Sequence, residues 1–97
     1  MLRRSRKRPA RGTQRKAPQL LFAALGDGTR LSLVAKLSPG EPLSIAQLTS
    51  GSRLTRQAIT KHLRVLEGAG LVHSIRRGRE SLFEFDPKPI VELKEYL

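Results

Sequence analysis

Between residues 19 and 68, hydrophobic residues recur at helical spacing in several segments. Four segments show this spacing: residues 19–25, 29–37, 45–49 and 55–68. In each of them, leucine, isoleucine, valine or phenylalanine side chains recur three or four residues apart, which places them on one face of a helix. The turn-forming stretches "SPGEP" and "SGSR" separate the later segments. We therefore predict four helices, of which the third is short.

Residues that favour helix ends stand at the predicted boundaries. Asp27, Ser44 and Thr55 precede the second, third and fourth helices, and their side-chain oxygens can accept the unpaired N–H groups of a first turn. Gly68 and Gly70 favour the end of the fourth helix. The caps and the hydrophobic spacing thus predict the same boundaries.

After Gly70 the hydrophobic pattern changes to that of strands. "LVHSIR" and "SLFEF" are rich in strand-forming residues, and Gly78 lies in the "RGRE" stretch between them. Asp86 is then expected to cap a last helix over "PKPIVELKEYL". The order is helix, helix, short helix, helix, hairpin, helix. This order predicts a mainly α fold with a small β-hairpin (α+β), namely a winged helix-turn-helix.

The predicted fourth helix is divided into an apolar side and a basic polar side. With about 100° of rotation per residue, its polar side chains lie within an arc of roughly 140°. They are Arg56, Gln57, Thr60, Lys61 and Arg64. The other side carries Ala58, Ile59, His62, Leu63, Val65 and Leu66. We expect the second set to pack against the domain and the first set to face outward.

The outward residues are of the types that read bases in the major groove of DNA. Arginine can donate two hydrogen bonds to guanine, glutamine can pair with adenine, and a threonine methyl can contact the thymine methyl. They gather near Thr55 at the start of the helix, the end that enters the groove in helix-turn-helix proteins. Taken alone, the same pattern fits the solvated face of an ordinary helix. The short helix, the turn and the hairpin around it favour DNA binding.

The predicted hairpin tip is also basic. Arg76, Arg77 and Arg79 surround Gly78, and we expect them to contact backbone phosphates or an adjacent minor groove. The alternative is a charged tip that keeps the hairpin soluble and unpaired. With Thr55 and the five polar residues of the fourth helix, these three arginines complete the candidate DNA-binding set.

The charge of the chain points to a polyanionic partner. The 97 residues include nineteen Lys and Arg and eight Asp and Glu, a formal net charge of +11. Eight of the basic residues fall within residues 3–16, which contain no acidic residue. We predict that residues 1–18 form a basic, disordered arm and that residues 19–97 form one domain. The arm also raises an alternative function, a nucleic-acid-binding module for RNA or the nucleoid that has no sequence preference.

Several other classes of function are not expected. The chain has no cysteine, so thiolate metal sites and thiolate nucleophiles are excluded. No apolar run approaches the roughly 20 residues that span a bilayer, and we expect a soluble cytoplasmic protein. His62 and His73 are interpreted as packing and strand residues, because no second ligand stands at metal-binding spacing. We expect no metal, no cofactor and no enzymatic activity, because no nucleophile, base and oxyanion donor can be assembled. A protein–protein adaptor on the same scaffold is a further alternative.

Three stretches and the basic hairpin, which continues into "LFEFD", resemble the ArsR family of bacterial winged-helix transcription regulators. The stretches are "LFAALGDGTRLSLVAKL", "LSIAQL" and "LTRQAITKHLRVLEGAGLV". The resemblance covers roughly residues 20–97. It implies double-stranded DNA as the partner, a fourth helix that reads the operator, repression relieved by a signal, and a nucleoid-associated location. It also implies a homodimer formed largely by the first and last helices. The metal-site motifs of many members, Cys-x-Cys in the third helix or Asp and His pairs in the last, are absent from this sequence.

Overall fold

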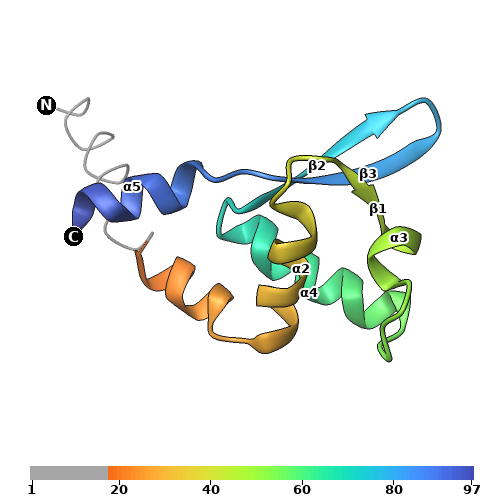
Figure 1. Ribbon diagram of the computed structural model, residues 1–97, viewed down its shortest axis with the longest axis horizontal. Coiled ribbons are helices and arrows are strands. Elements are labelled where there is room, and N and C mark those ends of the chain that lie inside the picture. The colour runs from red at the N-terminus through yellow and green to blue at the C-terminus, as the bar shows by residue number, and fades with distance from the viewer. Residues whose placement is uncertain (1–17) are drawn as a thin grey trace, which may run out of the picture.

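A computed structural model of the protein describes residues 18–97, and the order of its elements confirms the predicted fold (Figure 1). A first helical segment covers residues 18–25. The later helices are α2 (Gly28–Leu37), α3 (Ile45–Thr49), α4 (Arg56–Gly68) and α5 (Lys88–Tyr96). The strands are β1 (Leu43–Ser44), β2 (Val72–Arg77) and β3 (Glu80–Phe85). Apart from Pro18, which is helical, the predicted arm lies outside the described residues.

Three of the four predicted helix caps form as expected. Asp27 Oδ1 accepts the N–H of Arg30 at 3.0 Å, and Thr55 Oγ1 accepts the N–H of Ala58 at 3.1 Å. Ser44 forms a reciprocal pair of hydrogen bonds with the third residue of α3, the capping-box arrangement. These contacts satisfy N–H groups that have no partner within their own helix.

The start of α5 differs from the prediction by one residue. Pro87, not Asp86, is the residue that precedes the first helical turn. The backbone N–H of Asp86 donates to the carbonyl oxygen of Leu71 at 2.8 Å, which keeps Asp86 beside the sheet. Its carboxylate nevertheless accepts the N–H of Lys88 at 2.9 Å. Asp86 therefore stabilises the helix start from one position further back.

The strands form an antiparallel sheet in the order β1-β3-β2, which contains the predicted hairpin. Arg77 pairs with Glu80, so β2 and β3 are joined by a two-residue turn. Gly78 takes a φ of +60° there, as a glycine at the first turn position of a tight hairpin can. The short strand β1 was not predicted, since two residues are too few to show a strand pattern.

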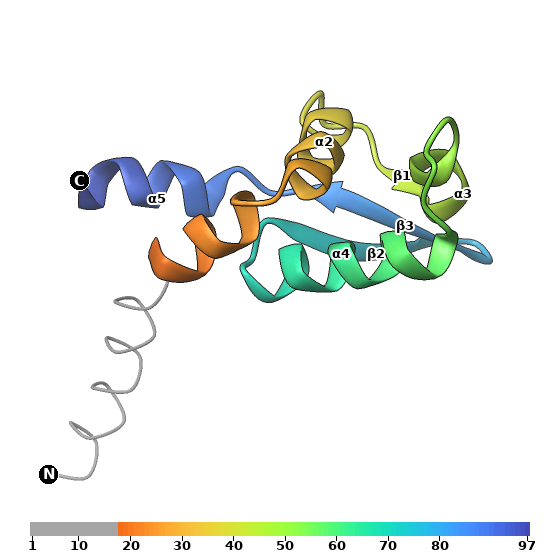
Figure 2. The same cartoon turned by 90° about the horizontal axis from the view of Figure 1, so that it is seen from below.

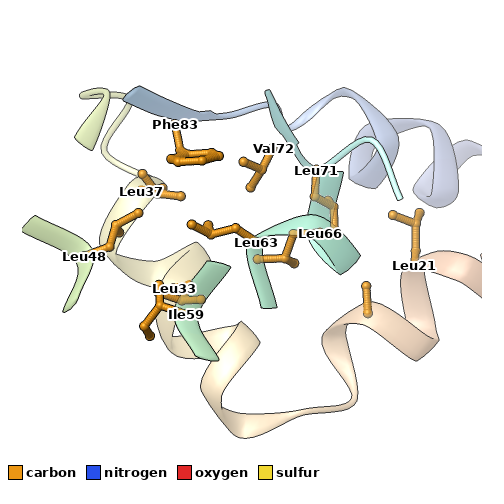
Figure 3. Close-up of a cluster of buried hydrophobic side chains, with 11 residues drawn as sticks. Leu21, Leu33, Leu37, Leu48, Ile59, Leu63, Leu66, Leu71, Val72 and Phe83 are labelled. Atoms are coloured by element: carbon orange, nitrogen blue, oxygen red, sulfur yellow. The ribbon is translucent and has the colours of Figure 1, made fainter. Parts of the chain in front are cut away.

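α4 lies at the centre of the hydrophobic core (Figure 3). Its side chains Ile59, Leu63 and Leu66 are at most 1% exposed. They meet buried side chains from the first helical segment, α2, α3, the sheet and the residue before it: Leu21, Ala24, Leu33, Leu37, Leu48, Leu71, Val72 and Phe83. Because the same helix carries the candidate site on its outer face, the core fixes how that face is presented.

Candidate nucleic-acid interface

Packing on one side of α4 turns the predicted polar side outward. Ile59, Leu63 and Leu66 are buried as predicted, whereas Arg56 and Gln57 at the start of the helix are exposed. The prediction was wrong for Val65, which is 45% exposed. Rotating the helix about its axis would expose the leucines, at a cost of roughly 1.5–3 kcal/mol for each buried side chain. The core therefore fixes which residues of α4 can reach a partner.

Four predicted residues of α4 present free polar ends, and two threonines are partly committed to the helix itself. Arg56, Gln57, Lys61 and Arg64 are exposed. Thr60 is partly buried, and its hydroxyl donates to the carbonyl oxygen of Arg56 at 2.8 Å. Thr55 is exposed, but its hydroxyl oxygen already serves as the cap of α4. The methyl groups of these threonines are the parts best suited to contact a base.

The three predicted arginines of the hairpin tip are exposed and lie on both of its faces. Arg76 and Arg77 are consecutive residues of β2, so their side chains point to opposite faces of the sheet. Arg76 shares the face of Ser74, whose hydroxyl donates to Glu67 Oε2 of α4 at 3.0 Å. The sequence pattern did not indicate this contact, which fixes the base of the hairpin against the end of α4. Arg79 follows Gly78 in the turn itself.

The first turn of α4 and the hairpin tip lie toward the same end of the molecule in both views (Figures 1 and 2). α3 lies at this end as well, whereas the first helical segment and α5 lie at the opposite end. Two segments that are separated in the sequence, the first turn of α4 and the hairpin tip at residues 76–79, thus lie toward one end of the protein, and both carry arginines.

The basic side chains of this end are not neutralised by carboxylates. Within residues 18–97, no side-chain nitrogen of Lys or Arg lies within 4.0 Å of a carboxylate oxygen; among the basic side chains, only His62 and His73 approach one. The cations of α4 and the hairpin tip therefore have no internal partner at salt-bridge distance in the described part of the chain. Such cations can replace the counterions of a polyanion when it binds.

Both histidines have hydrogen-bonding partners in the structure. His62 is partly buried, and its Nδ1 lies 3.3 Å from Arg30 Nη1, which agrees with its interpretation as a packing residue. His73 Nε2 lies 2.7 Å from Asp86 Oδ2, a partner that the sequence pattern did not indicate. In the described range, no three His, Cys, Asp or Glu side chains are grouped closely enough to hold a metal ion. None of the helices described is both long and apolar enough to cross a membrane.

Comparison with known proteins places this architecture in a family. The family profile for a helix-turn-helix domain matches residues 25–75. YuzN, an HTH-type transcriptional regulator of Bacillus subtilis, is 42% identical over an alignment of 79 positions, and the match covers 75% of this chain and 86% of YuzN. An ArsR-like transcriptional regulator from Rhodococcus sp. RHA1 is 33% identical in sequence, and its structure superposes with a TM-score of 0.77. That match covers 89% of this chain and 79% of the Rhodococcus chain. The chain belongs to the ArsR family.

Membership in the ArsR family confirms the resemblance drawn from the sequence. As a member, the chain is a DNA-binding transcription regulator. The fold is also shared by the homodimeric winged helix-turn-helix DNA-binding domain of Mb0332 from Mycobacterium bovis. That domain is 17% identical, with a TM-score of 0.72, and the match covers 89% of this chain and 79% of the other. At this level of identity the likeness concerns the fold alone.

Proposed function

We propose that this ArsR-family protein is a sequence-specific repressor that binds operator DNA as a homodimer. α4 enters the major groove of double-stranded DNA, and the hairpin tip contacts the backbone or the adjacent minor groove. The observation that carries the proposal is the set of exposed cations on α4 and the hairpin tip, which have no carboxylate at salt-bridge distance among residues 18–97. The protein acts as a binding protein, not as an enzyme, on the nucleoid in the cytoplasm.

The residues of α4 divide into base-reading and phosphate-binding roles. Arg56 and Gln57 lie in the first turn, where the helix enters the groove, and supply the bidentate donors and acceptors that distinguish base pairs. The methyl groups of Thr55 and Thr60 provide apolar contacts to thymine. Lys61 and Arg64 lie further along the same face and contact phosphates.

The test is a comparison of two duplexes. The full chain is titrated by fluorescence anisotropy into a duplex from upstream of its own gene and into a shuffled duplex of equal composition, at low and near-physiological salt. We expect the upstream duplex to bind more tightly at both salt concentrations. The double substitution Arg56→Ala with Gln57→Ala is expected to remove most of this preference, since each bidentate base contact contributes about 1–3 kcal/mol of discrimination.

Lys88→Ala is the matched control for charge. It removes one positive charge, as the double substitution does, but Lys88 lies at the start of α5. We expect it to leave the preference unchanged. The sequence-reading role of α4 is wrong if the double variant retains the full preference. Equal binding of both duplexes by the wild-type protein, lost at the higher salt, would instead support charge-driven binding without sequence preference.

Dimerisation is proposed through the first helical segment and α5, as the sequence resemblance implies. The two lie side by side at the end opposite the hairpin tip, where Pro18, Leu21, Pro89, Leu93 and Tyr96 line a groove between them. Large hydrophobic side chains remain exposed on both: Leu20, Phe22, Val91, Tyr96 and Leu97. Exposed apolar surface of this kind favours association. A second copy of the chain can cover it and align two α4 helices on successive half-sites.

Sedimentation at tens of micromolar, on the order of the dissociation constant of a weak dimer, tests this arrangement. We expect the wild-type chain to sediment as a dimer, and the variant Phe22→Glu with Val91→Glu to sediment as a monomer. These side chains are 58% and 52% exposed, so a folded monomer can carry the charges. Leu31→Glu on α2, at a position 50% exposed, is the control and should remain dimeric. If the double variant still sediments as a dimer, the interface does not lie on the first helical segment and α5.

A further inference from the structure

Arg30, on α2, bonds to two other helices through a single side chain. Its Nε donates to the carbonyl oxygen of Ala24 at 2.7 Å, and its Nη2 donates to that of Ala23 at 3.2 Å. Its Nη1 lies 3.3 Å from Nδ1 of His62 on α4. The backbone N–H of Arg30 is held by the cap residue Asp27 at 3.0 Å. One guanidinium thus connects the first helical segment, α2 and α4.

The two carbonyl groups belong to the last turn of the first helical segment. The final four carbonyls of a helix have no partner within it, and basic side chains near that end can bond to them. Arg30 meets this need with two of its five N–H donors and directs a third to α4. A lysine ammonium at the same position keeps the charge but has no planar fork to reach three acceptors at once. The contact therefore depends on arginine itself and not only on its charge.

The contact also orients the ring of His62. A guanidinium can only donate hydrogen bonds, so Nδ1 of His62 is the acceptor in this contact. Oδ1 of Asp27 lies 4.0 Å from the same Nδ1, too far for a hydrogen bond. His62 stands on the inner side of α4, three residues after Ile59 and four before Leu66. Arg30 therefore acts on the middle of α4, on the side opposite the proposed base-reading face.

We propose that Arg30 is a positioning residue for DNA reading: it holds α4, through His62, at a fixed rotation and distance relative to the first helical segment. This inference rests on the proposed function. The first helical segment is part of the proposed dimer interface, so Arg30 links the element that sets the spacing of the two subunits to the helix that reads each half-site. Without this link, α4 keeps its charges and its hydrophobic anchors but loses part of its alignment.

The experiment compares discrimination, not affinity alone. Arg30→Lys, in the full chain, is titrated into the upstream and shuffled duplexes, and the fraction of active protein is determined by stoichiometric titration. We expect the dissociation constant for the upstream duplex to rise about tenfold, comparable to the loss of one base contact. For the shuffled duplex it should change by less than about twofold, because the net charge is preserved. A merely structural role would lower the active fraction and leave the ratio of the two constants unchanged.

Arg53→Lys is the matched control, since Arg53 is exposed and its side chain forms no hydrogen bond or salt bridge with another described residue. This variant should have the same ratio of dissociation constants for the two duplexes as the wild type. Two substitutions of His62 test the path to α4. His62→Ala removes the acceptor and should reproduce the loss, whereas His62→Asn places an amide oxygen near the position of Nδ1 and should restore most of the discrimination. Combining Arg30→Lys with His62→Ala should add little to the larger single effect.

Each outcome separates this inference from the proposed function. A wild-type protein that binds both duplexes equally contradicts sequence reading, and the positioning role of Arg30 falls with it. A wild-type protein that discriminates, together with an Arg30→Lys variant that discriminates equally well, contradicts the positioning role alone. Additive losses from Arg30→Lys and His62→Ala would also overturn it, because the two side chains would then act independently.

Discussion

At the residue scale, Asp86 joins the hairpin to the last helix through both of its carboxylate oxygens. Oδ1 accepts the backbone N–H of Lys88, and Oδ2 lies 2.7 Å from Nε2 of His73. Both contacts favour the ionised carboxylate. The N–H of Lys88, and then the imidazole of His73, hold the pKa of Asp86 below its ordinary value of 3.8. This residue therefore connects the β2–β3 hairpin, the wing of the winged helix-turn-helix, with a helix of the proposed dimer interface. The tip of the wing is the part proposed to contact DNA.

The lowered pKa of Asp86 predicts how stability depends on pH. A carboxyl group whose folded pKa lies below its unfolded value stabilises the fold at pH values above the unfolded pKa. That contribution is lost as the pH falls through the folded pKa, below about pH 4. Asp86→Asn should therefore lower the free energy of unfolding at pH 7, by less than about 1 kcal/mol because the group is partly solvated. Denaturant unfolding at pH 7 and pH 3 checks this: the difference between variant and wild type should shrink at pH 3.

For single residues, the sequence predicts contacts between positions that are close together in the chain, but not contacts between distant elements. The caps Asp27 and Thr55 were predictable, because a cap bonds only two or three residues ahead. Arg30 and His62 are 32 residues apart in the sequence. The other partners of the Arg30 side chain are backbone carbonyls, which every residue has and which therefore give no sequence signal. The predicted outward residues of α4 follow from periodicity alone, although the internal hydrogen bond of Thr60 does not.

At the scale of the element, α4 begins at Thr55, and its first turn carries two of the proposed base-reading residues. Thr55→Ala removes the oxygen that accepts the N–H of Ala58 and should lower the free energy of unfolding by about 1 kcal/mol. For a domain of this size, that corresponds to a fall of roughly 4–8 °C in Tm. Thermal unfolding followed by circular dichroism measures it. Thr55→Ser keeps the oxygen and should retain most of the stability, whereas equal losses in both variants would assign the effect to the methyl group.

All five helical segments and the hairpin could be predicted, because each has a hydrophobic pattern of its own. β1 could not, because its two residues are ordered by pairing with β3, at Leu43 with Phe83 and Ser44 with Leu82. The start of α5 was also displaced by a tertiary contact, the hydrogen bond from Asp86 to Leu71. Elements determined by local sequence were thus recovered, and those determined by partners were not.

At the scale of the whole molecule, the proposed DNA-binding and dimerisation surfaces lie at opposite ends (Figures 1 and 2). The sequence indicated both sets of residues but not this separation, which depends on how α4 crosses the core beneath the sheet. The separation allows a second copy to cover the first helical segment and α5 while the basic end remains free. It also means that the wing can be tested without disturbing association.

The contribution of the wing to binding can be read from the salt dependence of affinity. Each phosphate neutralised by a basic side chain contributes about 0.9 to the slope of log K against log salt concentration. Replacing Arg76, Arg77 and Arg79 together by glutamine removes six arginines from the dimer, and should therefore reduce the slope by up to about 5.4 if all of them contact phosphates. Anisotropy titrations of the upstream duplex over a series of salt concentrations measure this slope, and sedimentation should show an unchanged dimer.

The matched variant replaces the same three arginines by lysine. Lysine keeps the charge but not the planar fork, so a wing that only neutralises phosphates should recover the full slope and the wild-type preference for the upstream duplex. If the slope recovers but the preference falls, at least one arginine reads the minor groove, where its shape and its bonding geometry matter. Since Arg76 and Arg77 point to opposite faces of β2, single lysine substitutions would then identify the face that lies in the groove. An unchanged slope in the glutamine variant would place the hairpin tip away from the DNA and leave binding to α4.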